Sequence, residues 1–182
     1  IPSKNGRIYF GGRRERDGTG GGVGWYDPAA KTFGGHHDNL SFLAPRGMVV
    51  LDDLQRVVYS GELQNDPTKP QEKPTQAQLV VYDMDLKELE RLTVKPGMKN
   101  TGLLLSSTRP GEFIGVSEED GVLYRYDLKN KRVLDWKTLP EGGVGGFARR
   151  ADGSWWGVMG GQLVRLDPAT LAIKSFGRFE TA

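Results

Sequence analysis

Short runs of apolar residues recur along the whole chain, and each is bounded by Gly, Pro, Asn or Asp. Two such runs are "FIGVS" at 113–117 and "VLYRYD" at 122–127, separated by an acidic turn. Aromatic and β-branched residues dominate these runs, and no stretch repeats its apolar positions with a helical period. The pattern predicts antiparallel β-strands joined by tight turns throughout.

Four of these runs end in an aspartate after a similar apolar segment. They are "VGWYD" at 23–27, "LVVYD" at 79–83, "VLYRYD" at 122–127 and "LVRLD" at 163–167. The aspartates are 56, 44 and 40 residues apart, close to the ~40–45 residues of a four-stranded propeller blade. The insertion Gln64–Ala77 accounts for the longer first interval.

Each aspartate is predicted to open a hairpin turn. In "YDPAAKTF" and "LDPATLAI" the carboxylate can accept a backbone N–H two residues on, and the Pro fixes φ. A further extended run follows each turn. One more precedes each hairpin, and a second precedes each of the last three hairpins, as in Gly47–Asp53 and Val57–Gly61. The repeating unit is therefore four antiparallel strands, here named A to D.

The fourth unit, "ADGSWWGVMGGQLVRLDPAT" at 151–170, carries a family resemblance most fully. It resembles the blades of bacterial β-propellers of the streptogramin-lyase-like, lactonase-like and sensor groups. The resemblance covers nearly the whole chain but implies architecture only, because propellers have many functions. It also implies a secreted or periplasmic protein. A twisted β-sandwich is the alternative fold, although a sandwich gives no reason for the repeat to stay in register.

We expect one all-β domain over residues 1–182, with approximate blades at 1–40, 41–97, 98–140 and 141–182. Asn5-Gly6 is predicted as the turn between strands A and B of the first blade, which leaves too few residues for its strand A. The expectation is a part of a larger propeller. The remainder of the propeller, or another chain, then completes the open blade.

Charge and composition exclude several partners. Lys plus Arg is 25 and Asp plus Glu is 23, so the net charge is +2, without the clustered excess of a nucleic-acid surface. The absence of cysteine excludes disulfides and thiolate metal sites. No apolar run reaches the roughly 20 residues of a membrane-spanning helix. We therefore predict neither nucleic-acid nor membrane binding.

Two adjacent histidines are the first candidate site residues. In propellers the B–C loops and the D–A connections gather on one face, and the resemblance implies the same here. His36 and His37 fall in the first predicted D–A connection, Gly34–Arg46, as a candidate catalytic base or metal ligand. Adjacent residues of an extended segment point to opposite sides, so we expect at most one to face a shared site. Solvated loop histidines are the alternative.

Charged residues at the end of strand B are the second set of candidates. Arg13, Glu62 and Glu118 follow strand B at corresponding points of the first three blades, so they can face one channel mouth. Arg13 and Arg14 suit an anionic ligand. The run Glu118-Glu119-Asp120 can supply oxygen ligands to Ca²⁺. Exposed, solvated turns are the alternative for each.

These residues predict a propeller that binds a small molecule, a polysaccharide or a protein through its loop face. The alternative is part of a propeller enzyme, a polysaccharide or streptogramin-type lyase or a lactonase-like hydrolase, with a divalent metal such as Ca²⁺ or Mg²⁺. The sequence leaves open which of the two applies, and it names no substrate.

Overall fold

The computed structural model describes residues 1–13, 21–36, 40, 42–64, 74–139 and 143–178. These residues form fifteen β-strands and no helix. No described segment is a helix of the length and hydropathy that crossing a membrane requires. The strands are β1 (Ile8–Arg13), β2 (Gly21–Asp27), β3 (Thr32–His36), β4 (Leu43–Leu51), β5 (Arg56–Leu63), β6 (Leu79–Tyr82), β7 (Glu88–Leu92), β8 (Leu103–Ser106), β9 (Glu112–Ser117), β10 (Val122–Asp127), β11 (Arg132–Thr138), β12 (Val144–Arg149), β13 (Trp155–Met159), β14 (Gln162–Leu166) and β15 (Ile173–Arg178).

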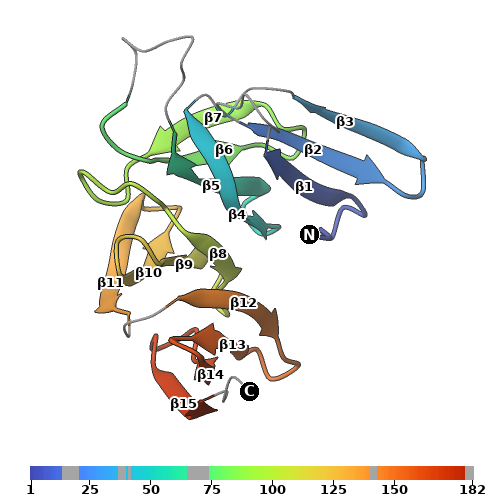
Figure 1. The fold of residues 1–182 in the computed structure, drawn as a ribbon. Coiled ribbons are helices and arrows are strands. Elements are labelled where there is room, and N and C mark those ends of the chain that lie inside the picture. The colour runs from blue at the N-terminus through green and yellow to red at the C-terminus, as the bar shows by residue number, and fades with distance from the viewer. Residues whose placement is uncertain (14–20, 37–39, 41, 65–73, 140–142, 179–182) are drawn as a thin grey trace.

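The strands form four antiparallel sheets that follow one another in chain order. Blade 1 is β1-β2-β3, blade 2 is β4 to β7, blade 3 is β8 to β11 and blade 4 is β12 to β15. Figure 1 shows the sheets along an open arc, with β4, β8 and β12 toward its inner side. The described strands therefore pair within a blade, and the prediction of all-β, four-stranded propeller blades with the first blade lacking strand A is confirmed.

Alternation of side chains along each strand gives every blade two packing faces. We call the face toward the preceding blade the backward face and the face toward the next blade the forward face. The residue just before each turn aspartate lies on the backward face, as Tyr82, Tyr126 and Leu166 do. Each of these is at most 1% exposed. The apolar core thus consists of layers between blades rather than of one central cluster.

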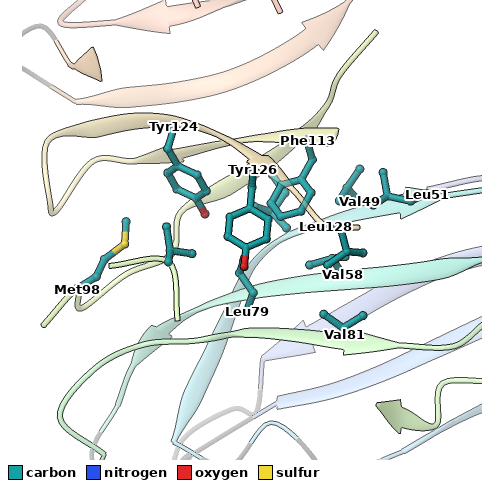
Figure 2. Close-up of a cluster of buried hydrophobic side chains, with 12 residues drawn as sticks. Val49, Leu51, Val58, Leu79, Val81, Met98, Phe113, Tyr124, Tyr126 and Leu128 are labelled. Atoms are coloured by element: carbon teal, nitrogen blue, oxygen red, sulfur yellow. The ribbon is translucent and has the colours of Figure 1, made fainter. Parts of the chain in front are cut away.

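The layer between blades 2 and 3 illustrates this packing (Figure 2). Phe113 and Tyr126 of blade 3 stack with ring centroids 5.3 Å apart. They face Val58 and Val81 of blade 2 in one buried cluster. Burial of such side chains contributes about 1.5–3 kcal/mol each relative to exposure. A layer of this kind holds each blade to its neighbour.

The aspartate turns of blades 2 and 4 also dock on the blade before them. In blade 1, Tyr9 Oη donates to the carbonyl of Met84 in the turn of blade 2 over 2.7 Å. In blade 3, a guanidinium N–H of Arg125 donates to the carbonyl of Ala169 in the turn of blade 4, and Lys137 Nζ donates to that of Thr170 over 2.8 Å. The signature aspartates therefore mark turns that also join neighbouring blades.

One glycine-rich segment differs from its predicted loop. The predicted D–A connection Gly34–Arg46 starts at Gly34, yet β3 continues to His36. A Cβ on Gly34 would lie 2.6 Å from Cζ2 of Trp25, and one on Gly35 would lie 2.4 Å from the carbonyl oxygen of Val23. These glycines are strand residues that leave room for Trp25 and the adjacent backbone, a role that composition alone does not distinguish from a loop.

Candidate functional site

A groove opens at one end of the inner strands, between blades 2, 3 and 4. Its volume is about 510 Å³. Arg46 comes from β4, Glu62 from β5, Glu118 from the turn after β9, and Val144 from β12. The lining residues, which we call the mouth groove, are Arg46, Glu62, Asn100, Gly102, Leu103, Val116, Glu118, Glu119, Val144, Gly145 and Gly146.

A β-bulge positions Arg46, the one cation among the described residues that line the mouth groove. The pairing of β4 with β5 shifts register between Pro45 and Gly47, so Arg46 is the extra residue. Such a bulge re-aims its side chain, and the Arg46 guanidinium forms an ion pair with the Glu62 carboxylate. Gly47 keeps the strand close to blade 3, because a Cβ there would lie 2.4 Å from the amide nitrogen of Leu104.

A buried hydrogen-bond network lies directly beneath Glu62 and fixes its backbone. The Gly61 N–H donates to Thr101 Oγ1 over 2.9 Å, and the Thr101 N–H donates to the Gly61 carbonyl over 3.0 Å. Ser60 Oγ also donates to the carbonyl of Gly102 in blade 3. The Tyr124 hydroxyl donates to the Thr101 carbonyl over 2.6 Å, and burial raises the pKa of this Tyr124 hydroxyl strongly. The groove wall is therefore rigidly joined across two blades.

The acidic run in blade 3 divides into two roles. The Asp120 carboxylate accepts the backbone N–H of Asn100 over 3.2 Å and the hydroxyl of Ser117 over 3.1 Å. It therefore holds the connection between blades 2 and 3 in place. Glu118 and Glu119 are exposed and line the mouth groove. Only these two carboxylates of the run are available to a ligand.

The structure thus brings together two of the predicted site residues, Glu62 and Glu118. It places His36 on β3, opposite Val23, where the side chain is exposed and not part of the mouth groove. Arg13 is the last residue of β1. His37 and Arg14 lie outside the described residues.

The structure gives less support to the predicted metal site than to a ligand-binding groove. Among the described residues, no three His, Asp or Glu side chains lie close enough together to hold a metal ion. Because several of the candidate residues lie outside that set, the catalytic role of His36 or His37 and the Ca²⁺ or Mg²⁺ site stay predictions.

Two residues of the mouth groove were not anticipated as site residues. Arg46 ends the predicted D–A connection Gly34–Arg46 and lies next to Gly47 within β4, and Asn100 lies two residues before Gly102, ahead of β8. The signal available in the sequence is their position shortly before a glycine. The bulge that selects Arg46 has no such sequence mark.

A second, more apolar cavity of about 550 Å³ continues along the inner strands. It shares Arg46, Leu103 and Gly146 with the mouth groove. Tyr59 and Trp155 add aromatic surface to it. The two cavities together form an elongated depression that is charged at one end and apolar along its length.

Comparison with solved structures identifies the architecture. The chain is similar to a chain of the crystal structure of the mitotic checkpoint complex, with 14% identity, a TM-score of 0.58, and coverage of 84% of this chain and 43% of that chain. It is also similar to the structure of U3-55K, with 8% identity, a TM-score of 0.57 and coverage of 85% and 45%. The fold is a β-propeller fold. At these identities the similarity shows the fold alone, and this chain spans less than half the length of either chain.

Comparison of sequence gives no further assignment. No protein-family model matches the chain, and no curated protein matches its sequence. The resemblance to bacterial streptogramin-lyase-like propellers is therefore carried only by the residues of the repeat itself.

Proposed function

We propose that this chain is a binding segment of a β-propeller and that its mouth groove receives a basic segment of a protein partner. The observation that carries the proposal is the convergence of Glu62, Glu118 and Glu119 from two blades on one groove with Arg46 as its counter-charge. Loops and strand ends held by a rigid scaffold are where binding residues concentrate.

Charge at the groove favours a cationic ligand. The Arg46 guanidinium is paired with Glu62, which leaves the exposed carboxylates of Glu118 and Glu119 as the net charge of the rim. Clefts lined by one sign of charge attract ligands of the opposite sign. The adjoining apolar cavity, lined by residues such as Leu103 and Phe147, suits the body of an extended peptide.

The test uses the 182-residue chain and a panel of fluorescently labelled lysine- and arginine-containing peptides. We expect binding by fluorescence anisotropy that weakens with added salt. The double variant Glu118→Gln/Glu119→Gln should weaken binding by up to about fivefold per carboxylate, because an exposed charge pair contributes about 0.2–1 kcal/mol. Asp53→Asn is the matched control, an exposed acid in the β4–β5 turn at the opposite end of the strands.

Comparing the double variant with Asp53→Asn separates binding at the mouth groove from attraction of the peptides to the overall charge of the protein. Equal loss with Asp53→Asn would mean that the peptides respond to overall charge and not to the mouth groove. Absence of binding by every peptide at low salt would contradict the proposal outright.

A further inference from the structure

The inner strands of blades 2 and 3 lie in close contact because a glycine separates them. A Cβ at Gly47 of β4 would lie 2.4 Å from the amide nitrogen of Leu104 and 2.9 Å from the Cα of Leu103, both in β8. Any side chain at Gly47 would therefore push the two strands apart. Val49 and Leu104, which belong to the apolar layer between these two blades, are only 3 and 4% exposed.

A leucine takes the place of this glycine between blades 3 and 4. Leu103 of β8 pairs with Val116 of β9, at the register where Gly47 of β4 pairs with β5. The Leu103 side chain packs with Phe147 of β12 and Trp155 of β13 against the apolar layer that joins blades 3 and 4. All three side chains stay half-buried. We call this set, Leu103, Phe147 and Trp155, the inner seam.

The inner seam is accessible from the mouth groove. All three of its residues line the apolar cavity of about 550 Å³, and Leu103 also lines the mouth groove. Trp155 Nε1 donates to the carbonyl of Ser106 over 2.9 Å, so the indole has its one polar group engaged and offers apolar surface. Glu118 lies beside the start of blade 4, because its Oε1 is 3.2 Å from the position of a Cβ on Gly143. Carboxylates thus stand next to an accessible apolar seam.

We propose that the inner seam receives an aromatic side chain of the same partner segment whose basic residue lies at Glu118 and Glu119. This inference rests on the proposed function and specifies its ligand, an extended peptide with an aromatic residue shortly after Lys or Arg. Exposed charge pairs contribute little affinity, so most of the binding energy comes from burial of an apolar anchor. An aromatic anchor suits the seam because ring pairs with Phe147 or Trp155 add to the burial of area.

The experiment measures the affinity of the 182-residue chain for matched peptides by fluorescence anisotropy. Each short labelled peptide has a Lys-Arg pair and a Phe at one of several positions after it, and each has a partner peptide with Ser in place of Phe. We expect the best Phe peptide to bind about tenfold more tightly than its Ser partner, as burial of a ring predicts. The ratio should stay the same when salt is added, because salt screens charges and not apolar contacts.

Filling the seam tests where the ring binds. Leu103→Trp should remove the tenfold advantage of Phe, since the larger side chain occupies the space for the ligand ring. Leu89→Trp is the matched control, the same change at a leucine of β7 that is 44% exposed and distant from the cavity. It should leave the advantage unchanged, and circular dichroism checks that both variants fold.

A measurement on the unaltered chain does not depend on how Leu103→Trp folds. The indole N–H signal of Trp155 is identified in NMR spectra as the signal missing from Trp155→Phe. The Phe peptide should shift this signal, and the Ser partner should not.

The outcomes distinguish the inner seam from the mouth groove. Peptides that bind through Lys-Arg with no advantage from Phe overturn this inference and leave the proposed function intact. An advantage that persists in Leu103→Trp, with the Trp155 signal unmoved, places the ring elsewhere and overturns it as well. Undiminished binding of the Phe peptide after its Lys-Arg pair is replaced by Ser would contradict the proposed function and retain the seam as an aromatic site. Absence of binding by every peptide overturns both.

Discussion

The turns of blade 1 and blade 4 share the residues Asp-Pro-Ala but have different surroundings. Asp27 Oδ1 accepts the N–H groups of Ala29 and Ala30 over 2.9 and 3.0 Å, and Asp167 Oδ1 accepts the two equivalent groups over 2.8 and 3.2 Å. The turn itself is therefore the same in both blades. Only the blade 4 turn has a preceding blade to cover it.

This difference shows that local sequence specifies the turn, while the neighbouring blade determines its energetic contribution. A substitution at a given position of the repeat should be costly where a blade covers the residue and mild where none does. Blade 1 thus supplies a control for the backward-face positions of its three strands and for its turn.

The largest difference in stability loss between matched variants is expected at the residue before the aspartate. Tyr126→Ala removes a buried ring stacked on Phe113 and should lower the free energy of unfolding by about 3–5 kcal/mol, the range for large aromatic truncations. Tyr26→Ala, in the equivalent position of blade 1, should cost about 1 kcal/mol or less, because Tyr26 is 39% exposed. Urea unfolding at low micromolar concentration measures both, and similar losses for the two variants would contradict the comparison.

A smaller difference in stability loss is expected between matched variants within the turn itself. Leu171 is fully buried between blades 3 and 4, whereas Lys31 is exposed at the same turn position of blade 1. Both have positive φ, 55° and 54°, so alanine is equally strained at either position. Leu171→Ala should therefore cost about 2–4 kcal/mol through lost burial, and Lys31→Ala less than about 0.5 kcal/mol. Thermal and urea unfolding check this pair, and a large loss in Lys31→Ala would assign the effect to the backbone.

The repeat made the fold predictable, and the matched turns show why. Each repeat aspartate marks a local turn that forms independently of its surroundings, so the spacing of these aspartates predicted the blades. They are Asp27, Asp83, Asp127 and Asp167. Because the turn forms independently of its surroundings, the spacing could not show which turns are covered by a neighbouring blade. Burial of Pro168 and exposure of Pro28 follow from blade order in space, which a local motif does not encode.

The candidate site was predictable only in part, for a similar reason. Glu62 and Glu118 occupy equivalent positions of two blades, so the repeat brought both to the mouth groove. Arg46 reaches the groove because of a β-bulge. The Asp120 carboxylate instead accepts a hydrogen bond from the backbone of the connection between blades 2 and 3. Both depend on contacts between blades. The glycines of β3 led to the opposite error, a strand predicted as a loop. Glycines that allow close packing on Trp25 give the strand a composition typical of a loop.

Hydroxyl groups in the blade layers offer a finer test. Blade 3 has Tyr124 where blade 1 has Gly24, and Tyr124 donates to the buried Thr101 carbonyl. Tyr124→Phe should cost about 1–3 kcal/mol, because it leaves that carbonyl without its donor. Tyr82 Oη is buried without a hydrogen-bond partner among the described residues, so Tyr82→Phe should change stability by less than about 0.5 kcal/mol or increase it. Equal losses in urea unfolding would mean that the bond to the Thr101 carbonyl does not set the cost of removing the hydroxyl.

The smallest difference concerns the turn carboxylate of blade 3. Asn130 donates to Asp127 from its side-chain amide over 2.7 Å and from its backbone over 3.0 Å. The side-chain bond is the main reason that the pKa of Asp127 lies below its ordinary value. Blade 1 has Ala30 at this position, so Asn130→Ala gives the blade 3 turn the blade 1 residue there, and the Asp127 pKa should rise toward about 3.9.

The lowered pKa links this carboxylate to acid stability. The ionised form is favoured in the folded state, so its stabilisation is present above the unfolded pKa of about 3.9 and is lost as pH falls through the lower folded pKa. Asn130→Ala should therefore destabilise slightly at pH 7, and the gap in melting temperature from the wild type should narrow toward pH 2. An NMR titration of the Asp127 carboxyl measures the shift directly. If the pKa stays low without the Asn130 amide, the backbone N–H groups suffice to hold the charge.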